Sequence, residues 1–430
     1  MMDKTSKLND SWEKIFNKYK ILEKISDEGH FNITATEINE FREARLMTKF
    51  DHKSQLPKLF HEHDLSILPT SRGGYVIGAF KTFHEFNDDD TSVSKINFPA
   101  FLESLDFKNI TSEAAAINCA FVSNILQDFV GEKALFPTVS GRMGSSVFDF
   151  DINSSNGLFK VNVENSQVEI DGGYEGELSL SIIEAKNYIS KDFLVRQLYY
   201  PYRLWNERVK KHVRPIFLTY SNGIFHLREY EFTEVQKYNS LVLVQHKKYT
   251  VHEGSLTFNV LQELIDKTEI VKEPEIPFPQ ADSFERVVNL GELLFEKEFI
   301  SKEDITRNYD FDARQTDYYS NAGKYLGILE IGKDILTGQI GCYLTSTGKR
   351  LFNLNIFDRQ KEFIKLIIAH SVFKQTLKLA LENKQIPTKD DVVEVMMKSN
   401  LYNVNSESTY RRRSSTVLGW LNWIVRQIEE

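Results

Sequence analysis

Apolar and polar residues alternate along the chain on both sides of a glycine pair at residues 172–173. Residues 167–171 alternate before this pair, and after it a largely apolar run leads to Glu184 and Lys186. Alternation with β-branched residues around a glycine turn predicts a β-hairpin. Because side chains two positions apart on a strand point to the same face, Glu184 and Lys186 are expected to project together.

The spacing of apolar residues elsewhere in the first part of the chain predicts helices alternating with strands. Apolar residues recur every three or four positions in 12–22, 112–129 and 193–202, which predicts helices. The pair Asn222-Gly223 between two apolar runs predicts a second hairpin. Such alternation predicts an α/β (α+β) core with a mixed β-sheet flanked by helices.

The second part of the chain follows a proline-rich segment and is predicted to be mainly helical. Three closely spaced prolines predict an interdomain linker over residues 273–281. Helices are predicted over 284–295, 301–305 and 312–329, followed by a β-ribbon over 336–350. Three helices and then a ribbon are typical of a winged helix.

Part of this pattern recurs near the C-terminus. A shift of 92 residues aligns Tyr318 with Tyr410 and the pair Leu326-Gly327 with Leu418-Gly419, and Thr388 and Ser406 are predicted N-caps. We therefore expect two helix-turn-helix-like units, whose final helices present N-terminal residues to DNA bases. The alternative is a protein–protein module with a solvated arginine cluster. The predicted base-reading residues are Arg314, Gln315, Thr316, Tyr410, Arg411, Arg412 and Arg413.

Two carboxylates and a lysine are predicted to converge on the first hairpin. Asp171 ends its first strand, while Glu184 and Lys186 lie on the second. Two carboxylates can hold Mg²⁺, and a lysine can orient or polarise an attacking water. Glu184 follows an apolar run, and a buried charge needs a partner or a metal. Gln197 is expected to hydrogen-bond that water or Glu184. The alternative is a solvated strand edge, with Gln197 an ordinary helix-face residue.

Composition indicates a soluble globular class. The chain has no apolar run of membrane-spanning length and no apolar signal core at its polar N-terminus, so we expect no membrane contact. Two cysteines are too few for a disulfide framework or a Cys-rich zinc site, which favours a reducing cytoplasm. His52, His61 and His63 lack an accompanying Cys or carboxylate pattern and are predicted to be surface histidines.

Charge is unevenly distributed. The formal net charge of -8 does not itself suggest nucleic acid, but residues 186–214 contain eight Lys or Arg against two acids, a local charge of +6, with aromatic residues between them. A Gly/Ser-rich loop predicted over 138–146 carries one arginine and suits close approach to a phosphate, with a plain surface loop as the alternative. The predicted phosphate-contacting residues are Arg142, Lys191, Arg196, Arg203, Arg208, Lys210 and Lys211.

Asp171 followed by Glu184-Ala185-Lys186 resembles the PD-(D/E)XK nuclease signature, with Ile170 in place of the proline. Further stretches make most of the chain similar to a bacterial type II restriction endonuclease. These stretches are residues 43–52, 170–175, 183–187, 196–203 and 408–413.

This resemblance implies Mg²⁺-dependent hydrolysis of both strands of double-stranded DNA at a short sequence, leaving 5′-phosphates. It implies a homodimer, and a cognate DNA methyltransferase that acts on the same site without needing to bind the nuclease. In many such nucleases a helix before the hairpin adds a carboxylate to the metal site. Glu113 is the candidate here, with compensation of the helix dipole as its alternative role.

The resemblance also gives names to the predicted regions. We expect an N-terminal α+β DNA-contacting region, a nuclease core, the linker, a winged-helix-like domain and a second helix-turn-helix-like domain. Their boundaries are 1–100, 101–272, 273–281, 282–355 and 356–430.

Two other functions remain open at this point. One is a non-catalytic DNA-binding regulator with tandem winged helices, and the other is a modification-dependent or repair nuclease with the same core. A regulator has no reason to keep Asp171, Glu184 and Lys186 together on one buried face, and this feature separates it from both kinds of nuclease.

Overall fold

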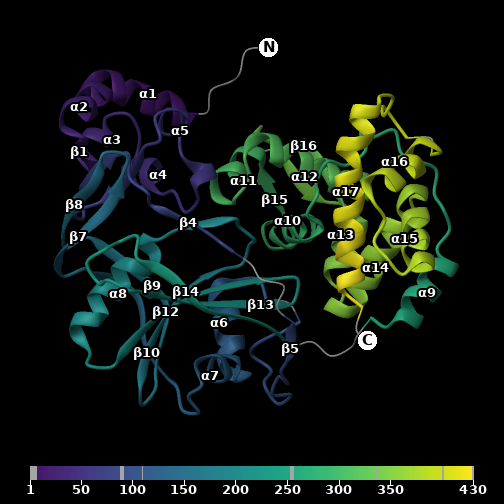
Figure 1. Ribbon diagram of the computed structural model, residues 1–430, viewed down its shortest axis with the longest axis horizontal. Coiled ribbons are helices and arrows are strands. Elements are labelled where there is room, and N and C mark those ends of the chain that lie inside the picture. Colours follow the sequence, from purple (N-terminus) through teal and green to yellow (C-terminus); the bar gives the residue numbers. More distant parts are fainter. Residues whose placement is uncertain are drawn as a thin grey trace.

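The computed structural model describes residues 7–87, 92–108, 110–251, 256–335, 337–399 and 401–428. The chain forms an N-terminal region, a central sheet with its helices, and a mainly helical C-terminal region, at the upper left, lower left and right of Figure 1. Within the described ranges, no helix combines the length and the apolar character needed to cross a membrane.

The N-terminal region has a hydrophobic core of its own. Its elements are α1 (Lys7–Tyr19), α2 (Ile21–Glu28), β1 (His30–Thr34), α3 (Ala35–Asn39), α4 (Ala44–Thr48), η1 (Lys53–Gln55), α5 (Lys58–Glu62), β2 (Ser66–Pro69) and β3 (Gly74–Gly78). The three strands form an antiparallel sheet in the order β1-β3-β2. Trp12, Phe16 and Phe60 pack edge to face in the core, so aromatic contacts hold α1 against α5.

This core ends at Ile77, well before the predicted boundary at residue 100. The next two strands make their backbone hydrogen bonds with the central region: β4 pairs with β11, and β5 pairs with β14. They therefore belong to the central region. The strands concerned are β4 (Phe83–Glu85), β5 (Val93–Lys95), β11 (Asp192–Leu194) and β14 (Leu241–Thr250).

The central region is built on a seven-stranded sheet in the order β5-β14-β13-β12-β10-β9-β6. Its other strands are β6 (Phe136–Gly144), β9 (Gln167–Glu175), β10 (Ser179–Lys186), β12 (His212–Ser221) and β13 (Ile224–Phe232). β10 with β12 and β14 with β5 are parallel, and the other neighbours are antiparallel. The predicted mixed sheet is confirmed, as is the hairpin at Asn222-Gly223, where both residues have positive φ.

Helices cover both faces of this sheet, so alternate residues of β10 pack on opposite sides. α8 lies on one face, together with a β7–β8 hairpin, and α6 and α7 lie on the other. The predicted single helix over 112–129 is two helices, because Asn124 takes a left-handed conformation between them. The elements are α6 (Glu113–Val122), α7 (Ile125–Val130), β7 (Val147–Ser154), β8 (Gly157–Glu164) and α8 (Arg196–Arg208).

The glycine pair at 172–173 lies inside β9, and the predicted turn there is wrong. The chain instead turns after Glu175, in residues 176–178. A Cβ on Gly173 would lie 2.6 Å from the Cβ of Val139, so this glycine allows β6 to approach closely. The segment 138–146, predicted to be a loop, forms most of β6 for the same reason.

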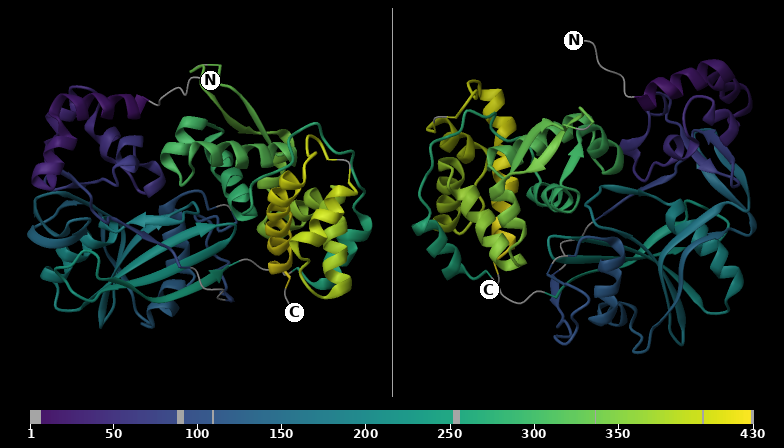
Figure 2. Two further views of the ribbon diagram at one scale, coloured as in Figure 1. Left: turned by 45° about the horizontal axis from the view of Figure 1, so that its top comes forward. Right: turned by 180° about the vertical axis from the view of Figure 1, so that it is seen from behind.

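The C-terminal region begins with three helices and a small antiparallel sheet in the order β15-β17-β16. Its first elements are α10 (Phe284–Lys297), β15 (Phe299–Ser301), α11 (Lys302–Asn308), α12 (Ala313–Tyr325), β16 (Leu329–Lys333) and β17 (Ile340–Leu344). Ser301 and Asp312 cap α11 and α12, which confirms the predicted helix starts. The two views of Figure 2 show α10 to α12 lying between the N-terminal region and the last helices.

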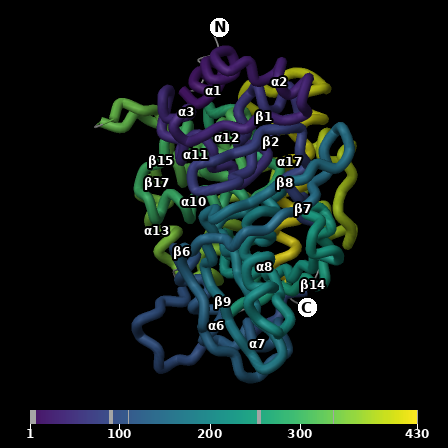
Figure 3. The backbone as a smooth tube through the Cα atoms, turned by 90° about the vertical axis from the view of Figure 1, so that its left-hand side faces the viewer, coloured from purple at the N-terminus to yellow at the C-terminus, as the bar shows by residue number. Residues whose placement is uncertain are grey.

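The ribbon predicted over residues 336–350 is only partly right. Its first strand is β16, which begins at Leu329, and Leu336 lies outside the described residues. Residues 346–352 are helical because Thr345 provides an N-cap. The hairpin of β16 and β17 projects from the body of the molecule in Figure 3.

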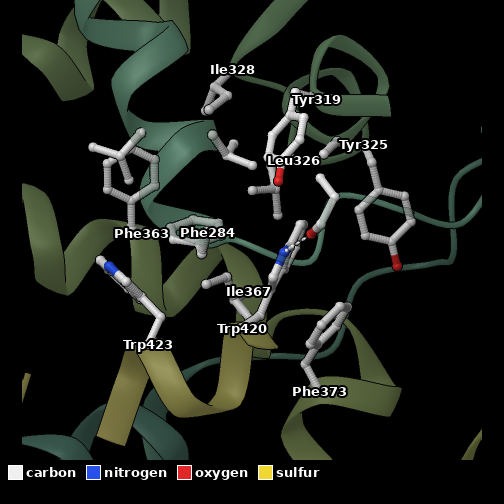
Figure 4. Close-up of a cluster of buried hydrophobic side chains, with 14 of the residues drawn as sticks. Phe284, Tyr319, Tyr325, Leu326, Ile328, Phe363, Ile367, Phe373, Trp420 and Trp423 are labelled. Atoms are coloured by element: carbon white, nitrogen blue, oxygen red, sulfur yellow. Dashed lines mark hydrogen bonds between the residues drawn. The ribbon is translucent and has the colours of Figure 1, made fainter. Parts of the chain in front are cut away.

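The remaining helices share one large core with α10 to α12. In Figure 4, Trp420 and Trp423 of the last helix lie beside Phe284 and Phe363. The helix α9 also belongs to this core, so the C-terminal packing begins before the predicted boundary at 273. The helices are α9 (Phe258–Lys267), α13 (Ser346–Phe352), α14 (Ile356–Ile368), α15 (Ser371–Asn383), α16 (Lys389–Met397) and α17 (Glu407–Arg426).

Trp420→Ala should lower the free energy of unfolding of the C-terminal region by about 3–5 kcal/mol, because it removes a fully buried ring. It also removes the hydrogen bond from Trp420 Nε1 to the Ala281 carbonyl oxygen, which is 2.7 Å long. Urea denaturation followed by far-UV circular dichroism measures the change. The exposed Tyr402→Ala is the control and should change it by less than about 0.5 kcal/mol. Equal stability of the two variants would contradict the packing described.

Candidate functional site

The structure brings Asp171, Glu184, Lys186 and Gln197 together at the end of β10. Asp171 lies on the adjacent strand β9, and its Oδ2 accepts a hydrogen bond of 2.8 Å from the backbone N–H of Ala185. Gln197, in the first turn of α8, donates from Nε2 to Glu184 Oε1 at 2.7 Å. Two neighbouring strands and the start of a helix thus hold these four side chains. Asp171 lies just beyond the last residue of β9 that pairs with β10.

Glu184 and Lys186 form a buried ion pair. Lys186 Nζ lies 2.5 Å from Glu184 Oε1, and the side chains are 8% and 9% exposed for Lys186 and Glu184 respectively. Glu113, at the start of α6, contributes a third carboxylate 3.9 Å from Lys186 Nζ. A buried pair of this kind is costly to break, since removal of one partner leaves the other charge uncompensated.

Burial and neighbouring charges together raise the pKa values of both members of this pair. Burial raises the pKa of Glu184 to about 8, and the charges of Asp171 and Asp51 act in the same direction. Burial alone would lower the pKa of Lys186, but the charges of Glu184, Tyr188 and Glu113 raise it well above its ordinary value. Lys186 therefore stays protonated at neutral pH, and it acts as a fixed cation rather than as a base.

These groups line a cavity of about 610 Å³ to which all three regions contribute. The N-terminal region contributes Lys49 and Asp51, and the C-terminal region contributes residues 307–309. The central region contributes cations besides Lys186, including Arg142 and Arg196. The acids and cations that line this cavity together suit a phosphate-bearing ligand that also brings a metal ion.

Asp171, Glu184 and Glu113 are the carboxylates of this cavity that could contact a metal ion. Across the described ranges, no group of three or more His, Cys, Asp and Glu side chains is arranged as a ready metal cage. Mg²⁺ needs no such cage, because it keeps several waters and uses one or two carboxylates together with substrate phosphates. Asp171 and Glu184 could supply those carboxylates, with Glu113 beside them.

Sequence reasoning missed three residues near this site. Asp51 lines the cavity, and Tyr188 lies two residues after Lys186. The prediction that His52 is a surface histidine is wrong, because it is fully buried behind Tyr188, whose hydroxyl lies 2.9 Å from His52 Nε2. On its other side, His52 Nδ1 lies 2.6 Å from the Asp192 carbonyl oxygen. Asp51 and His52 fall within the stretch 43–52 that carries part of the resemblance, but no spacing rule relates them to the motif.

The C-terminal region is fastened to the site through the segment before α12. Asp310 accepts hydrogen bonds from the Ser54 hydroxyl at 2.7 Å and from the Lys191 backbone N–H at 2.6 Å. The ring of Tyr309 packs edge to face on Tyr188, with centroids 5.2 Å apart. Because α12 starts directly after this segment, its first turn has a fixed position relative to the site.

The basic residues predicted to contact phosphate divide into two groups. Arg203 is buried, donates to the Asp149 carbonyl oxygen and the Tyr199 hydroxyl, and is not available to DNA, so this prediction is wrong. Lys211 is tied to Glu175 at 2.6 Å, and Arg142 is tied to Glu169 at 3.0 Å. Arg142, Lys191, Arg208 and Lys210 are exposed, and Arg196 is half-buried.

The residues predicted to read bases also differ in availability. Thr316 is buried against Thr306 and cannot reach a base, which corrects that prediction. Arg411 is held by Asp390 at 2.8 Å and by Glu407 at 3.3 Å.

Arg413 is also occupied within the protein. It donates through both terminal nitrogens to the Gln280 side-chain oxygen, at 2.6 and 2.7 Å, when that amide is oriented to accept. Gln315 takes part in the capping box of α12, and Tyr410 packs partly against the C-terminal core. Arg314 and Arg412 are exposed, and neither makes a hydrogen bond or ion pair with the residues that the structure describes.

Three family models match successive parts of the chain, and each is described as a domain of unknown function. DUF6996 matches residues 9–77, DUF6997 matches 78–250 and DUF7226 matches 286–429. No curated protein and no solved structure matches the chain. The first match ends where the N-terminal core ends, and the site at the end of β10 combines residues from all three matched parts.

Divalent-cation binding should tighten as pH rises toward 8. A proton on Glu184 competes with a cation, and the raised pKa of Glu184 makes this competition stronger than at an ordinary carboxylate. Below this pKa, the affinity for Mn²⁺ should fall by about tenfold per pH unit if one proton is displaced. Titration calorimetry at several pH values measures this, and Glu184→Gln should bind weakly without the pH dependence. An affinity that is constant across this range would show that Glu184 takes no part in cation binding.

Proposed function

We propose that this chain is a site-specific double-stranded DNA endonuclease of the PD-(D/E)XK superfamily, acting in a bacterial restriction-modification system. The observation that carries the proposal is the hydrogen-bonded group of Asp171, Glu184, Lys186 and Gln197 at the end of β10, in which Glu184 and Lys186 are buried and the other two are half-buried. A DNA-binding regulator would gain nothing from burying Glu184 with Lys186 and placing a second carboxylate beside them, because such burial costs free energy. A nuclease uses the same charges to hold a cation and a phosphate.

The residues have separate tasks in this proposal. Asp171 and Glu184 would hold Mg²⁺, which when bound supplies positive charge beside the phosphate and lowers the pKa of water. Lys186, fixed by Glu184 and permanently protonated, orients the attacking water and stabilises negative charge on the phosphate oxygens. Gln197 holds Glu184 in place. The water oxygen then adds to phosphorus and the bond to the 3′-oxygen breaks. Water loses a proton to solvent and the 3′-oxygen takes one up from solvent, so the products are a 5′-phosphate and a 3′-hydroxyl.

The C-terminal region would supply the choice of sequence. The order α10, β15, α11, α12, β16, β17 is that of a winged helix, and α12 would lie in the major groove with the hairpin beside it. Arg314 starts α12, and Arg412 lies in the first turns of α17. Arg196, Arg208 and Lys210 would contact phosphates.

One site cuts one strand, so hydrolysis of both strands calls for two copies of the chain. We accordingly propose a homodimer, with a cognate methyltransferase that modifies the same DNA sequence. The homodimer and the methyltransferase both follow from the proposed activity, and no particular surface of the molecule is assigned to either.

Asp171→Ala and Lys186→Ala should each reduce cleavage of cognate DNA by at least about 10²–10³-fold while specific binding persists. The reason is that Asp171→Ala removes a carboxylate that holds the cation, and Lys186→Ala removes the charge that stabilises the phosphate as phosphorus is attacked. Single-turnover cleavage and a parallel binding assay in Ca²⁺ separate the two effects. Glu175→Ala, on the same strand β9 but outside the cavity lining, is the control. Near-wild-type cleavage by the Asp171 or Lys186 variant would rule out this active site.

Arg314→Ala or Arg412→Ala should weaken binding to cognate DNA selectively, by about 1–3 kcal/mol for an arginine that reads guanine. These two guanidinium groups have no competing partner in the described part of the chain, whereas Arg411 has two carboxylates. Competition between cognate and scrambled duplexes measures the selectivity. Arg411→Ala is the matched control and should have a smaller effect. Unchanged discrimination in both test variants would move base reading away from the starts of α12 and α17.

A further inference from the structure

Asp51 lies against the proposed nuclease site but comes from the N-terminal region. It is 120 positions before Asp171 in the sequence, and it belongs to the part matched by a different family model. Its side chain is only 13% exposed. A carboxylate placed beside two other carboxylates destabilises the fold unless cations or hydrogen-bond donors compensate its charge. The exposed Lys49 lies 3.8 Å from Asp51 Oδ2, and the Gln197 amide is the donor on the side of Glu184.

Gln197 connects Asp51 with Glu184. Its Nε2 donates to Glu184 Oε1 at 2.7 Å and lies 3.3 Å from Asp51 Oδ1. A side-chain amide nitrogen carries two hydrogens, so one group can serve both carboxylates. The Gln197 Oε1 is buried and makes no hydrogen bond in the described structure, which leaves the two carboxylates to fix how this amide is turned.

The position of Asp51 is itself fixed from both sides. Its backbone N–H donates to Gln55 Oε1 at 2.7 Å, and its carbonyl oxygen accepts from the Leu194 N–H at 3.0 Å. The next residue, His52, is buried against the carbonyl of Asp192. The N-terminal region is thereby joined to β11, just before α8 and Gln197.

Glu184 has one oxygen occupied and one remaining. Both Lys186 and Gln197 donate to its Oε1. Its Oε2 makes no hydrogen bond or ion pair within the described ranges, and it is the oxygen left for a cation. The direction of Oε2 depends on the hydrogen bond that the Gln197 amide donates to Oε1. The orientation of that amide depends in turn on its contact with Asp51.

We propose that Asp51 is a positioning residue of this site, acting through Gln197 to hold the Glu184 carboxylate in the orientation that binds a divalent cation. The inference rests on the proposed nuclease function. It makes the N-terminal region a required part of the cation site rather than only a DNA-contacting arm.

Asp51→Asn should weaken Mn²⁺ binding to the full chain by about 10–100-fold, the usual effect of losing a group that orients a metal ligand. Asn keeps the size of Asp51, but its neutral amide oxygen is a weaker acceptor for Gln197, and its NH₂ group can turn toward Gln197 instead. Titration calorimetry with Mn²⁺ gives the binding constant, and the Mg²⁺ concentration for half-maximal cleavage should rise in parallel. Asp64→Asn, an exposed acid of the same region, is the control and should bind Mn²⁺ like the wild type.

The double variant Asp51→Asn with Gln197→Ala distinguishes positioning from a loss of charge or of folding. If Asp51 acts through Gln197, the double variant should bind Mn²⁺ no more weakly than Gln197→Ala alone. Additive losses, or wild-type binding by Asp51→Asn, would overturn the inference. Either of these results excludes only the role of Asp51, provided that the wild-type protein cleaves DNA and Asp171→Ala does not. If wild-type protein binds no Mn²⁺, the proposed function fails with it.

Discussion

The buried ion pair of Glu184 and Lys186 is the interaction on which the site depends. Two charges at the end of a central strand would each be costly alone, and their mutual contact at 2.5 Å offsets only part of that cost. The amide of Gln197 and the nearby carboxylates then determine where the remaining negative charge lies. The carboxylates of the site outnumber its one buried lysine. A bound cation would balance the excess negative charge, as the proposed binding of a cation and a phosphate requires.

The other regions are arranged around this pair. The strands β9 and β10 set Asp171 beside Glu184, and α8 brings Gln197 onto the same face. The N-terminal region reaches the site through Asp51, while Tyr309 and Asp310 fasten the C-terminal region behind it. DNA recognition in the C-terminal region and chemistry at β10 would therefore be linked through one short segment before α12.

Features that depend on neighbours in sequence could be predicted from the sequence. The caps at Ser301, Asp312 and Thr388, the hairpin at Asn222-Gly223 and the pairing of Glu184 with Lys186 on one strand face all follow from local rules.

Features that depend on distant packing could not be predicted. Gly173 resembles a turn residue until β6 is placed against it, and His52 resembles a surface histidine until β11 covers it. Arg203 and Thr316 carry suitable polar groups, yet tertiary contacts bury both.

The most direct test of the nuclease account is to incubate the purified chain with plasmid DNA of mixed sequence, in Mg²⁺ and in EDTA, and to sequence the resulting ends. The account predicts discrete fragments in Mg²⁺ only, with cuts in both strands at one short sequence and phosphates at the 5′ ends. Intact DNA in Mg²⁺, with specific binding retained, would contradict it and would favour a DNA-binding regulator.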